Sequence, residues 1–231
     1  MSIAENVAAI KADIQKAALA AGRDPKEILL CAATKMNDAD AVRQAIAAGV
    51  DCCGENRVQE LTQKLSENAY EGAPVHFIGH LQTNKVRQVV GKVDLIQSVD
   101  RLKLLQCIQA EAAKQGIVQD ILLEINIGEE ESKSGFGIAD ILPLADKMSD
   151  FPNVRVKGLM VIPPICENPG DNDKFFYEIS NLAVDITTKK YDNIEADILS
   201  MGMSGDYADA IACGSTMIRV GTAIFGPRHY V

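Results

Sequence analysis

The sequence has few basic residues and no long apolar run, and both shortages narrow the class of protein. Its 23 lysines and arginines are outnumbered by 32 aspartates and glutamates, for a net charge of −9. This balance argues against broad binding to nucleic acid or an anionic membrane. The sequence contains no run of about 18 apolar residues, the length that a membrane-spanning helix needs. Residues 1–16 also lack the apolar core of a signal peptide. We therefore expect a cytoplasmic protein.

Disulfide and metal-binding cysteine patterns are also missing. No C-x-x-C spacing occurs, and only Cys52 and Cys53 are neighbours. His76 and His80 are four residues apart, but we expect them on a strand and its following loop rather than on one helix face. We therefore expect no metal site and interpret all six cysteines as free thiols that act as small apolar residues. They are Cys31, Cys52, Cys53, Cys107, Cys166 and Cys213.

Short apolar runs alternate with helical patterns along the whole chain. An opening helix is indicated by Ile3, Val7, Ile10 and Ile14, and Gly22 with Pro25 should end it. Eight strand candidates follow, each leading into a helical segment or the start of one. They are EILLCAATK (27–35), DCCGEN (51–56), VHFIGH (75–80), DLIQSV (94–99), DILLEINIG (120–128), VRVKGLMVI (154–162), ADILSMGM (196–203) and TMIRVG (216–221).

This alternation predicts a parallel sheet with helical crossovers. Eight units favour a single (β/α)8 TIM-type barrel domain over residues 1–231, with an extra N-terminal helix. An open doubly wound sheet is the alternative. The absence of G-x-G-x-x-G after the first strand argues against the dinucleotide-binding version of that sheet.

Ligands of such barrels bind at the carboxyl ends of the strands, where the first strand candidate ends in Lys35. A lysine at the interior mouth is costly unless its charge is used or lost. It is either a solvated rim lysine or a Schiff-base lysine, since desolvation lowers a lysine pKa and frees the amine.

The last two strands supply the other candidates. The eighth strand should lie beside the first, which brings Arg219 near Lys35 and calls for an anionic ligand. The loops after strands seven and eight contain Ser204, Gly205, Gly221 and Thr222, and loops in these positions commonly form phosphate sites in barrels. A lysine, an arginine and a phosphate cup suggest pyridoxal 5′-phosphate (PLP), although an aldolase without a cofactor fits the same pattern.

Several motifs resemble those of a known family. They are GENRVQE (54–60), HFIGHLQTNK (76–85), IQSVD (96–100), SKSGFG (132–137), GLMVIPP (158–164), LSMGMSGDYADAI (199–211) and GSTMIRVGTAIFG (214–226). In this order they resemble the PLP homeostasis family, whose members are relatives of the alanine racemase barrel.

The resemblance implies roles for individual residues. Lys35 would carry PLP as an internal aldimine, and Arg219 would face the pyridine nitrogen. The phosphate would be held by Ser204, Gly221 and Thr222. Asn56, His80 and Met201 would lie near the ring at the barrel mouth, so all eight residues are expected to bind the cofactor and none to be purely catalytic.

The resemblance also implies a function, which is to buffer PLP and deliver it to apo-enzymes, with indirect effects on amino-acid and keto-acid levels. An arginine at the ring nitrogen leaves the ring a poor electron sink. The chain ends at Val231, a few residues after the last strand, so we expect no racemase second domain and a monomer. A single-domain PLP-dependent amino-acid racemase is the alternative.

Overall fold

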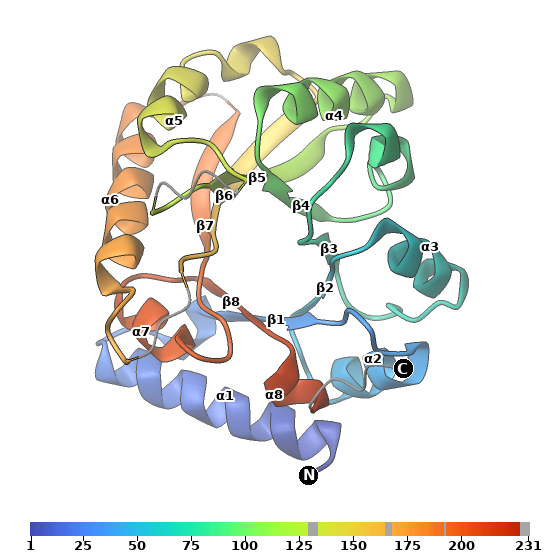
Figure 1. The fold of residues 1–231 in the computed structure, drawn as a ribbon, viewed down its shortest axis with the longest axis vertical. Coiled ribbons are helices and arrows are strands. Elements are labelled where there is room, and N and C mark those ends of the chain that lie inside the picture. The colour runs from blue at the N-terminus through green and yellow to red at the C-terminus, as the bar shows by residue number, and fades with distance from the viewer. Residues whose placement is uncertain (129–133, 165–167, 192, 227–231) are drawn as a thin grey trace.

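The computed structural model describes residues 1–128, 134–164, 168–191 and 193–226, and its eight parallel strands close into a barrel. The strands pair in chain order, and the last pairs with the first. They are β1 (Leu29–Ala33), β2 (Cys52–Glu55), β3 (Val75–Phe77), β4 (Leu95–Val99), β5 (Gln119–Ile125), β6 (Val154–Val161), β7 (Ile194–Ser200) and β8 (Met217–Val220). Figure 1 shows the strands at the centre with helices around them. The predicted TIM-type barrel is confirmed, and the open sheet is wrong because β8 closes on β1.

The helices follow the predicted order. They are α1 (Ile3–Ala20), η1 (Pro25–Glu27), α2 (Ala39–Ala47), α3 (Val58–Ser66), η2 (Thr83–Gln88), α4 (Leu102–Gln115), α5 (Ile138–Ala145), η3 (Met148–Asp150), α6 (Asp173–Lys189), α7 (Tyr207–Ala212) and α8 (Thr222–Phe225). The segment after β3 forms the 3₁₀ helix η2, in keeping with the three-residue spacing of buried Val86 and Val89. Within the described ranges, no helix is long and apolar enough to cross a membrane.

The N-terminal helix α1 covers the seam where β8 meets β1. The helix after β8, α8, is only four residues long, and α1 packs against α2, α7 and α8 (Figure 1). Val7, Ile10, Ile14 and Ala18 form its buried stripe at helical spacing. The extra N-terminal helix predicted from the sequence, α1, therefore covers the β8–β1 seam, for which the four-residue α8 is too short.

Hydrogen bonds fix α1 and the turn after it to the end of the chain. The Asn6 side-chain amide donates to the carbonyl of Ile224 at 2.9 Å. Arg23 donates to the carbonyls of Ile211 and Ser215 at 2.8 and 2.7 Å. Because these carbonyls lie at the end of α7, just before β8 and within α8, the N-terminal segment holds the elements that close the barrel.

The barrel interior contains two small apolar clusters, separate from the main core between strands and helices. One consists of Cys31, Cys52 and Met217, and the other of Leu95, Leu122 and Met160; Ile198 packs against both. Buried polar side chains on the same strands, among them Gln97, Ser200 and Arg219, form a further interior layer. The inside of the barrel therefore contains both apolar clusters and a set of buried polar side chains.

A buried ion pair joins the end of β1 to β2 and α3. The Glu55 carboxylate is fully buried and accepts from Lys64 Nζ at 2.6 Å, Tyr70 Oη at 2.9 Å and Thr34 Oγ1 at 3.0 Å. The Lys64 ammonium also donates to the Thr34 carbonyl at 2.7 Å. Burial beside this carboxylate raises the pKa of the Tyr70 hydroxyl, so Tyr70 stays a donor. The network fixes the backbone immediately before Lys35.

Substituting Glu55→Gln should lower the free energy of unfolding by about 3–5 kcal/mol, because it removes the buried carboxylate 2.6 Å from Lys64 Nζ and leaves this charge only Glu60, at 3.7 Å. Urea denaturation followed by far-ultraviolet circular dichroism measures this change. The matched control is Asp40→Asn in the exposed Arg43–Asp40 pair, which should change stability by less than about 1 kcal/mol. Equal effects of the two substitutions would contradict the structural role of the Glu55 network.

Candidate functional site

Lys35 lies in a tight turn directly after β1, at the carboxyl ends of the strands. The next residue, Met36, adopts φ +62°, a left-handed conformation that is strained for a residue other than glycine. The Met36 amide donates to Glu60 Oε2 at 2.7 Å, while the Glu55 network holds Thr34 on the other side. The turn that presents Lys35 is thus fixed by its neighbours on both sides.

These contacts show what two residues of the motif GENRVQE (54–60) do in the structure. Glu55 and Glu60 of the motif hold the backbone on the two sides of Lys35. Sequence reasoning missed both glutamates, and it missed Lys64. The sequence offered one indication of their role, a pair of acidic residues on either side of a strand–helix junction. This pattern alone does not reveal which groups the two carboxylates contact.

Arg219 on β8 is only 5% exposed, inside the barrel. Its Nη1 donates to the Ser200 carbonyl and hydroxyl, both at 2.6 Å, and its Nη2 donates to the Val161 carbonyl at 2.8 Å. Burial lowers the pKa of Arg219, and the charges of Cys31 and Glu124 act against this shift. The predicted proximity of strands one and eight is confirmed, because Arg219 lies beside Cys31 in the β1–β8 register.

A chain of hydrogen bonds leads from Arg219 across the barrel interior. The Ser200 hydroxyl accepts from Arg219 and donates to Gln97 Oε1 at 2.6 Å. Gln97 Nε2 lies 2.9 Å from His76 Nδ1 and 3.1 Å from the Met217 sulfur. Because Ser200 occupies the amide oxygen, Gln97 presents its NH₂ group to His76.

The far end of this chain is a cluster of two cysteines and a histidine. One ligand atom each of Cys31, Cys52 and His76 lies within 4.8 Å of the others, and all three residues are buried. The hydrogen bond with Cys52 is the largest cause that lowers the pKa of the Cys31 thiol, with His76 and Arg219 adding to it. The same hydrogen bond raises the pKa of Cys52.

Of the predicted phosphate residues, Ser204 lies in the loop after β7, Gly221 directly follows β8, and Thr222 begins α8. Ser204 and Thr222 are exposed and Gly221 is half-buried. A Cβ at Gly221 would lie 3.4 Å from both the Cβ and the carbonyl oxygen of Ala33, so the loop after β8 runs against the end of β1. These loops and Lys35 therefore share one end of the barrel.

Asp206 shapes the loop that contains Ser204. Its carboxylate accepts from the Met203 amide at 2.7 Å and from the Asn172 side chain at 3.1 Å. Asp206 occupies the N-cap position of α7 without a side-chain capping bond. These contacts leave Ser204 at the exposed edge of the loop.

Asn56 and Met201 follow β2 and β7 at the same end of the barrel. Asn56 Oδ1 is buried and, among the described residues, has no hydrogen-bond partner. A buried polar atom of this kind calls for a partner that a ligand or water can supply. Met201 is fully buried in the main apolar core.

His80 forms a pair with a buried carboxylate. Its Nδ1 lies 3.2 Å from Asp100 Oδ2, with the imidazole 55% exposed and the Asp100 side chain 2% exposed. Arg101 bonds to the other oxygen of Asp100. Nearby on β5, burial and then the charge of Asp100 raise the pKa of Glu124 to about 7. Sequence analysis did not identify Asp100 or Glu124 as part of the site.

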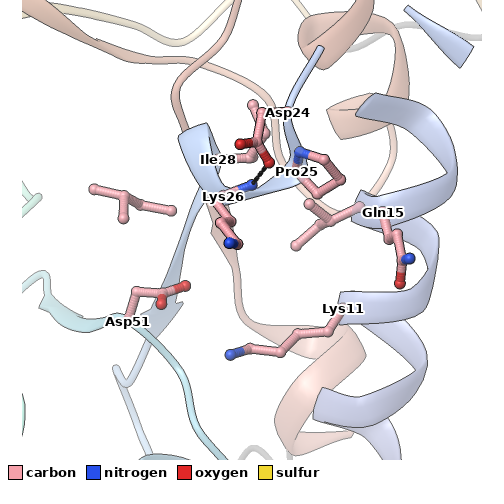
Figure 2. Close-up of a pocket in the computed structure, with 9 residues that line it drawn as sticks. Lys11, Gln15, Asp24, Pro25, Lys26, Ile28 and Asp51 are labelled. Atoms are coloured by element: carbon pink, nitrogen blue, oxygen red, sulfur yellow. Dashed lines mark hydrogen bonds between the residues drawn. The ribbon is translucent and has the colours of Figure 1, made fainter. Parts of the chain in front are cut away.

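A separate hollow of about 540 Å³ lies at the opposite, amino-terminal end of the barrel. Figure 2 shows Lys11, Asp24, Lys26 and Asp51 around it. Asp51 accepts from the Leu30 amide at 2.8 Å, so this carboxylate serves the start of β1. Residues at this end of a TIM-type barrel contribute to stability rather than to ligand chemistry.

The fold and the residues at the barrel mouth define the class of protein, a barrel of the alanine racemase N-terminal type. The family described as "Alanine racemase, N-terminal domain" matches residues 5–229. The pyridoxal phosphate homeostasis protein of Aquifex aeolicus is 41% identical over 230 residues, covering 100% of both chains. The protein of the same name from Escherichia coli K12 is 39% identical over 232 residues, covering 99% of this chain and 97% of the relative.

A solved structure agrees with these matches. PipY of Synechococcus elongatus, determined with PLP bound, superposes with a TM-score of 0.84 at 32% identity, covering 97% of this chain and 100% of PipY. The chain therefore belongs to the family of pyridoxal phosphate homeostasis proteins. The family predicted from the motifs is confirmed. Residues 132 and 133 of the SKSGFG motif, and Cys166, lie outside the described residues.

Proposed function

We propose that this protein binds PLP at the barrel mouth, buffers it, and delivers it to apo-enzymes that require it. The observation that carries the proposal is the placement of Lys35 in the turn after β1, next to the strand β8 that contains Arg219. The backbone on both sides of Lys35 is held by Glu55 and Glu60, and the Arg219 guanidinium is buried in the neighbouring part of the barrel. The PLP-bound structure of PipY and the names of the relatives support the same ligand.

The residues at the mouth fit this cofactor chemically. The site offers an amine at Lys35 for an aldehyde, a guanidinium at Arg219, and a buried Asn56 oxygen that lacks a partner among the described residues. Hydroxyls and flexible backbone for a phosphate are available at Ser204, Gly221 and Thr222. When bound, PLP supplies an aldehyde that condenses reversibly with amines and a ring that withdraws electrons best when its nitrogen is protonated.

Each residue has a distinct role in this proposal. Lys35 forms the covalent bond, and the Glu55 and Glu60 contacts hold its turn in place. Ser204, Gly221 and Thr222 hold the phosphate. Asn56 and His80 border the ring, as the family resemblance implies, whereas the burial of Met201 in the main apolar core does not support the same role for Met201.

Arg219 favours a carrier over a catalyst. Its two terminal nitrogens already donate to Ser200 and Val161, so its position is set before any ligand arrives. A guanidinium donates hydrogen bonds but gives up its proton only at very high pH. Arg219 therefore orients a ring nitrogen without protonating it, and carbanion chemistry at the site is poorly supported.

A second candidate function, amino-acid racemisation, is favoured by the His80–Asp100 pair. A carboxylate behind a half-exposed imidazole fixes its orientation, as general acid–base catalysis requires. Lys35 would then serve one face of a substrate and His80 the other. The last experiment in this subsection separates the two functions.

Borohydride reduction of the PLP-loaded protein should fix the pyridoxyl group on Lys35. Peptide mapping by mass spectrometry gives the position of the label. Lys35→Ala should lose the visible absorption band of the lysine adduct, whereas Lys26→Ala, in the hollow at the other end of the barrel (Figure 2), should keep it. A label found mainly on a different lysine would overturn the assignment of Lys35.

PLP should stabilise the folded protein much more than pyridoxal without its phosphate. At 100 times its Kd, a ligand adds about 2.7 kcal/mol to the free energy of unfolding, which corresponds to a Tm rise of about 5–10 °C. At the same concentration, pyridoxal leaves the Ser204, Gly221 and Thr222 contacts unused, binds more weakly and should shift the Tm less. Equal shifts in differential scanning calorimetry would contradict the phosphate site.

The PLP-loaded protein should exchange the α-deuteron of alanine no faster than free PLP does, as measured by proton NMR. It should nevertheless transfer PLP to an apo-enzyme, and Lys35→Ala should alter that transfer. Fast stereoinversion that is lost in both Lys35→Ala and His80→Ala would instead establish the racemase and reject the carrier.

A further inference from the structure

The cluster of Cys31, Cys52 and His76 has no part in the proposed binding of PLP. Its atoms belong to neighbouring strands in the barrel interior, where Cys31 and Cys52 are direct partners in the β1–β2 register. The two cysteines are 0% and 2% exposed, and His76 is 7% exposed. Such complete burial makes the cluster inaccessible to large ligands and suitable only for an ion.

We propose that Cys31, Cys52 and His76 form a binding site for a soft monovalent metal ion, Cu(I), inside the barrel. The three ligand atoms lie within 4.8 Å of one another. Two metal–sulfur bonds of about 2.3 Å span at most about 4.6 Å, so only a small adjustment brings all three atoms onto one ion. The fold thus brings the three ligand atoms close together.

The donor set is soft. Thiolates and thioethers select Cu(I) and zinc among common ions, and imidazole accepts both. The sulfur of Met217 belongs to the same interior cluster as Cys31 and Cys52, with Ile198 packed against it. These apolar neighbours keep hard oxygen ligands and water away from the ion.

Coordination number and charge both favour Cu(I) over zinc. Structural zinc is almost always four-coordinate, whereas among the described residues this cluster offers three cysteine, histidine or carboxylate ligands. Two thiolates with one Cu(I) carry a charge of −1, which balances the buried Arg219 next to Cys31 in register. With zinc the same ligands would be neutral and would add no negative charge opposite Arg219.

Binding requires no redox step. Each S–H bond breaks with its electron pair remaining on sulfur, the sulfur donates that pair to the metal, and the two protons leave to solvent. His76 binds through the lone pair of Nδ1 after its hydrogen bond from Gln97 Nε2 breaks. Copper stays Cu(I) and both sulfurs stay reduced. Because the site is closed in the folded state, we expect the ion to enter during folding.

The test loads the full-length reduced protein with Cu(I) by refolding it without oxygen in a Cu(I) buffer set by bicinchoninate. The wild-type protein should retain one copper per chain, with X-ray absorption showing two sulfur ligands. Cys31→Ala and Cys52→Ala should each weaken binding by more than about 100-fold, because even changes behind a ligand cost 10–100-fold.

The matched control is Cys53→Ala, next to Cys52 in sequence but buried in the main core rather than in the interior cluster. It should keep the wild-type affinity. Equal loss in all three variants, tighter binding of zinc than of Cu(I), or an absorption spectrum without sulfur ligands would each overturn the proposal. The spectrum of the wild-type protein decides the matter even if an alanine variant fails to fold.

Discussion

The buried charge of Arg219 is the constraint on which the barrel interior depends. A guanidinium that is 5% exposed must have its donors satisfied, since an unpaired buried charge costs several kcal/mol. Its partners come from β6 and β7, and the chain that continues through Gln97 and His76 reaches β4 and β3. Five of the eight strands are therefore linked through one cation, and the polar layer inside the barrel follows from it.

The other end of the proposed site is organised by a buried anion. The Glu55 carboxylate gathers Lys64, Tyr70 and Thr34 around the end of β1, and the strained Met36 conformation is maintained by the surrounding contacts. Folding free energy is thereby used to hold the turn of Lys35 still before a ligand binds, which reduces the entropy that binding must remove. A lysine on a fixed turn suits a protein that binds and releases one ligand repeatedly.

The proposed metal site and the proposed PLP site share Arg219 without sharing ligands. Cys31 lies beside Arg219 in register, while Lys35 follows four residues further along the same segment. A negatively charged metal–thiolate centre would balance the arginine charge within the barrel. The net charge of the barrel interior beneath a ligand at the mouth would then depend on whether the metal site is occupied.

The sequence by itself determined the alternation of strands and helices, the number of strands and the family. Apolar periodicity is a local property, so β1 to β8 and the α1 stripe can be read along the chain. Lys35 and Arg219 could be brought together because eight such units imply closure, and closure sets strand one beside strand eight. The motifs GENRVQE and LSMGMSGDYADAI identified the family because their order of residues is specific to it.

Only the tertiary structure decided which side chains meet across the barrel. Cys31, Cys52 and His76 are separated by 21 and 24 positions in the sequence, so no local spacing pattern could reveal their cluster. The roles of Glu55, Glu60 and Lys64 around the Lys35 turn, and of Asp100 behind His80, were hidden for the same reason. Each depends on the register between strands or the packing of a helix, and these are fixed by burial and hydrogen bonding of the whole barrel rather than by neighbouring residues.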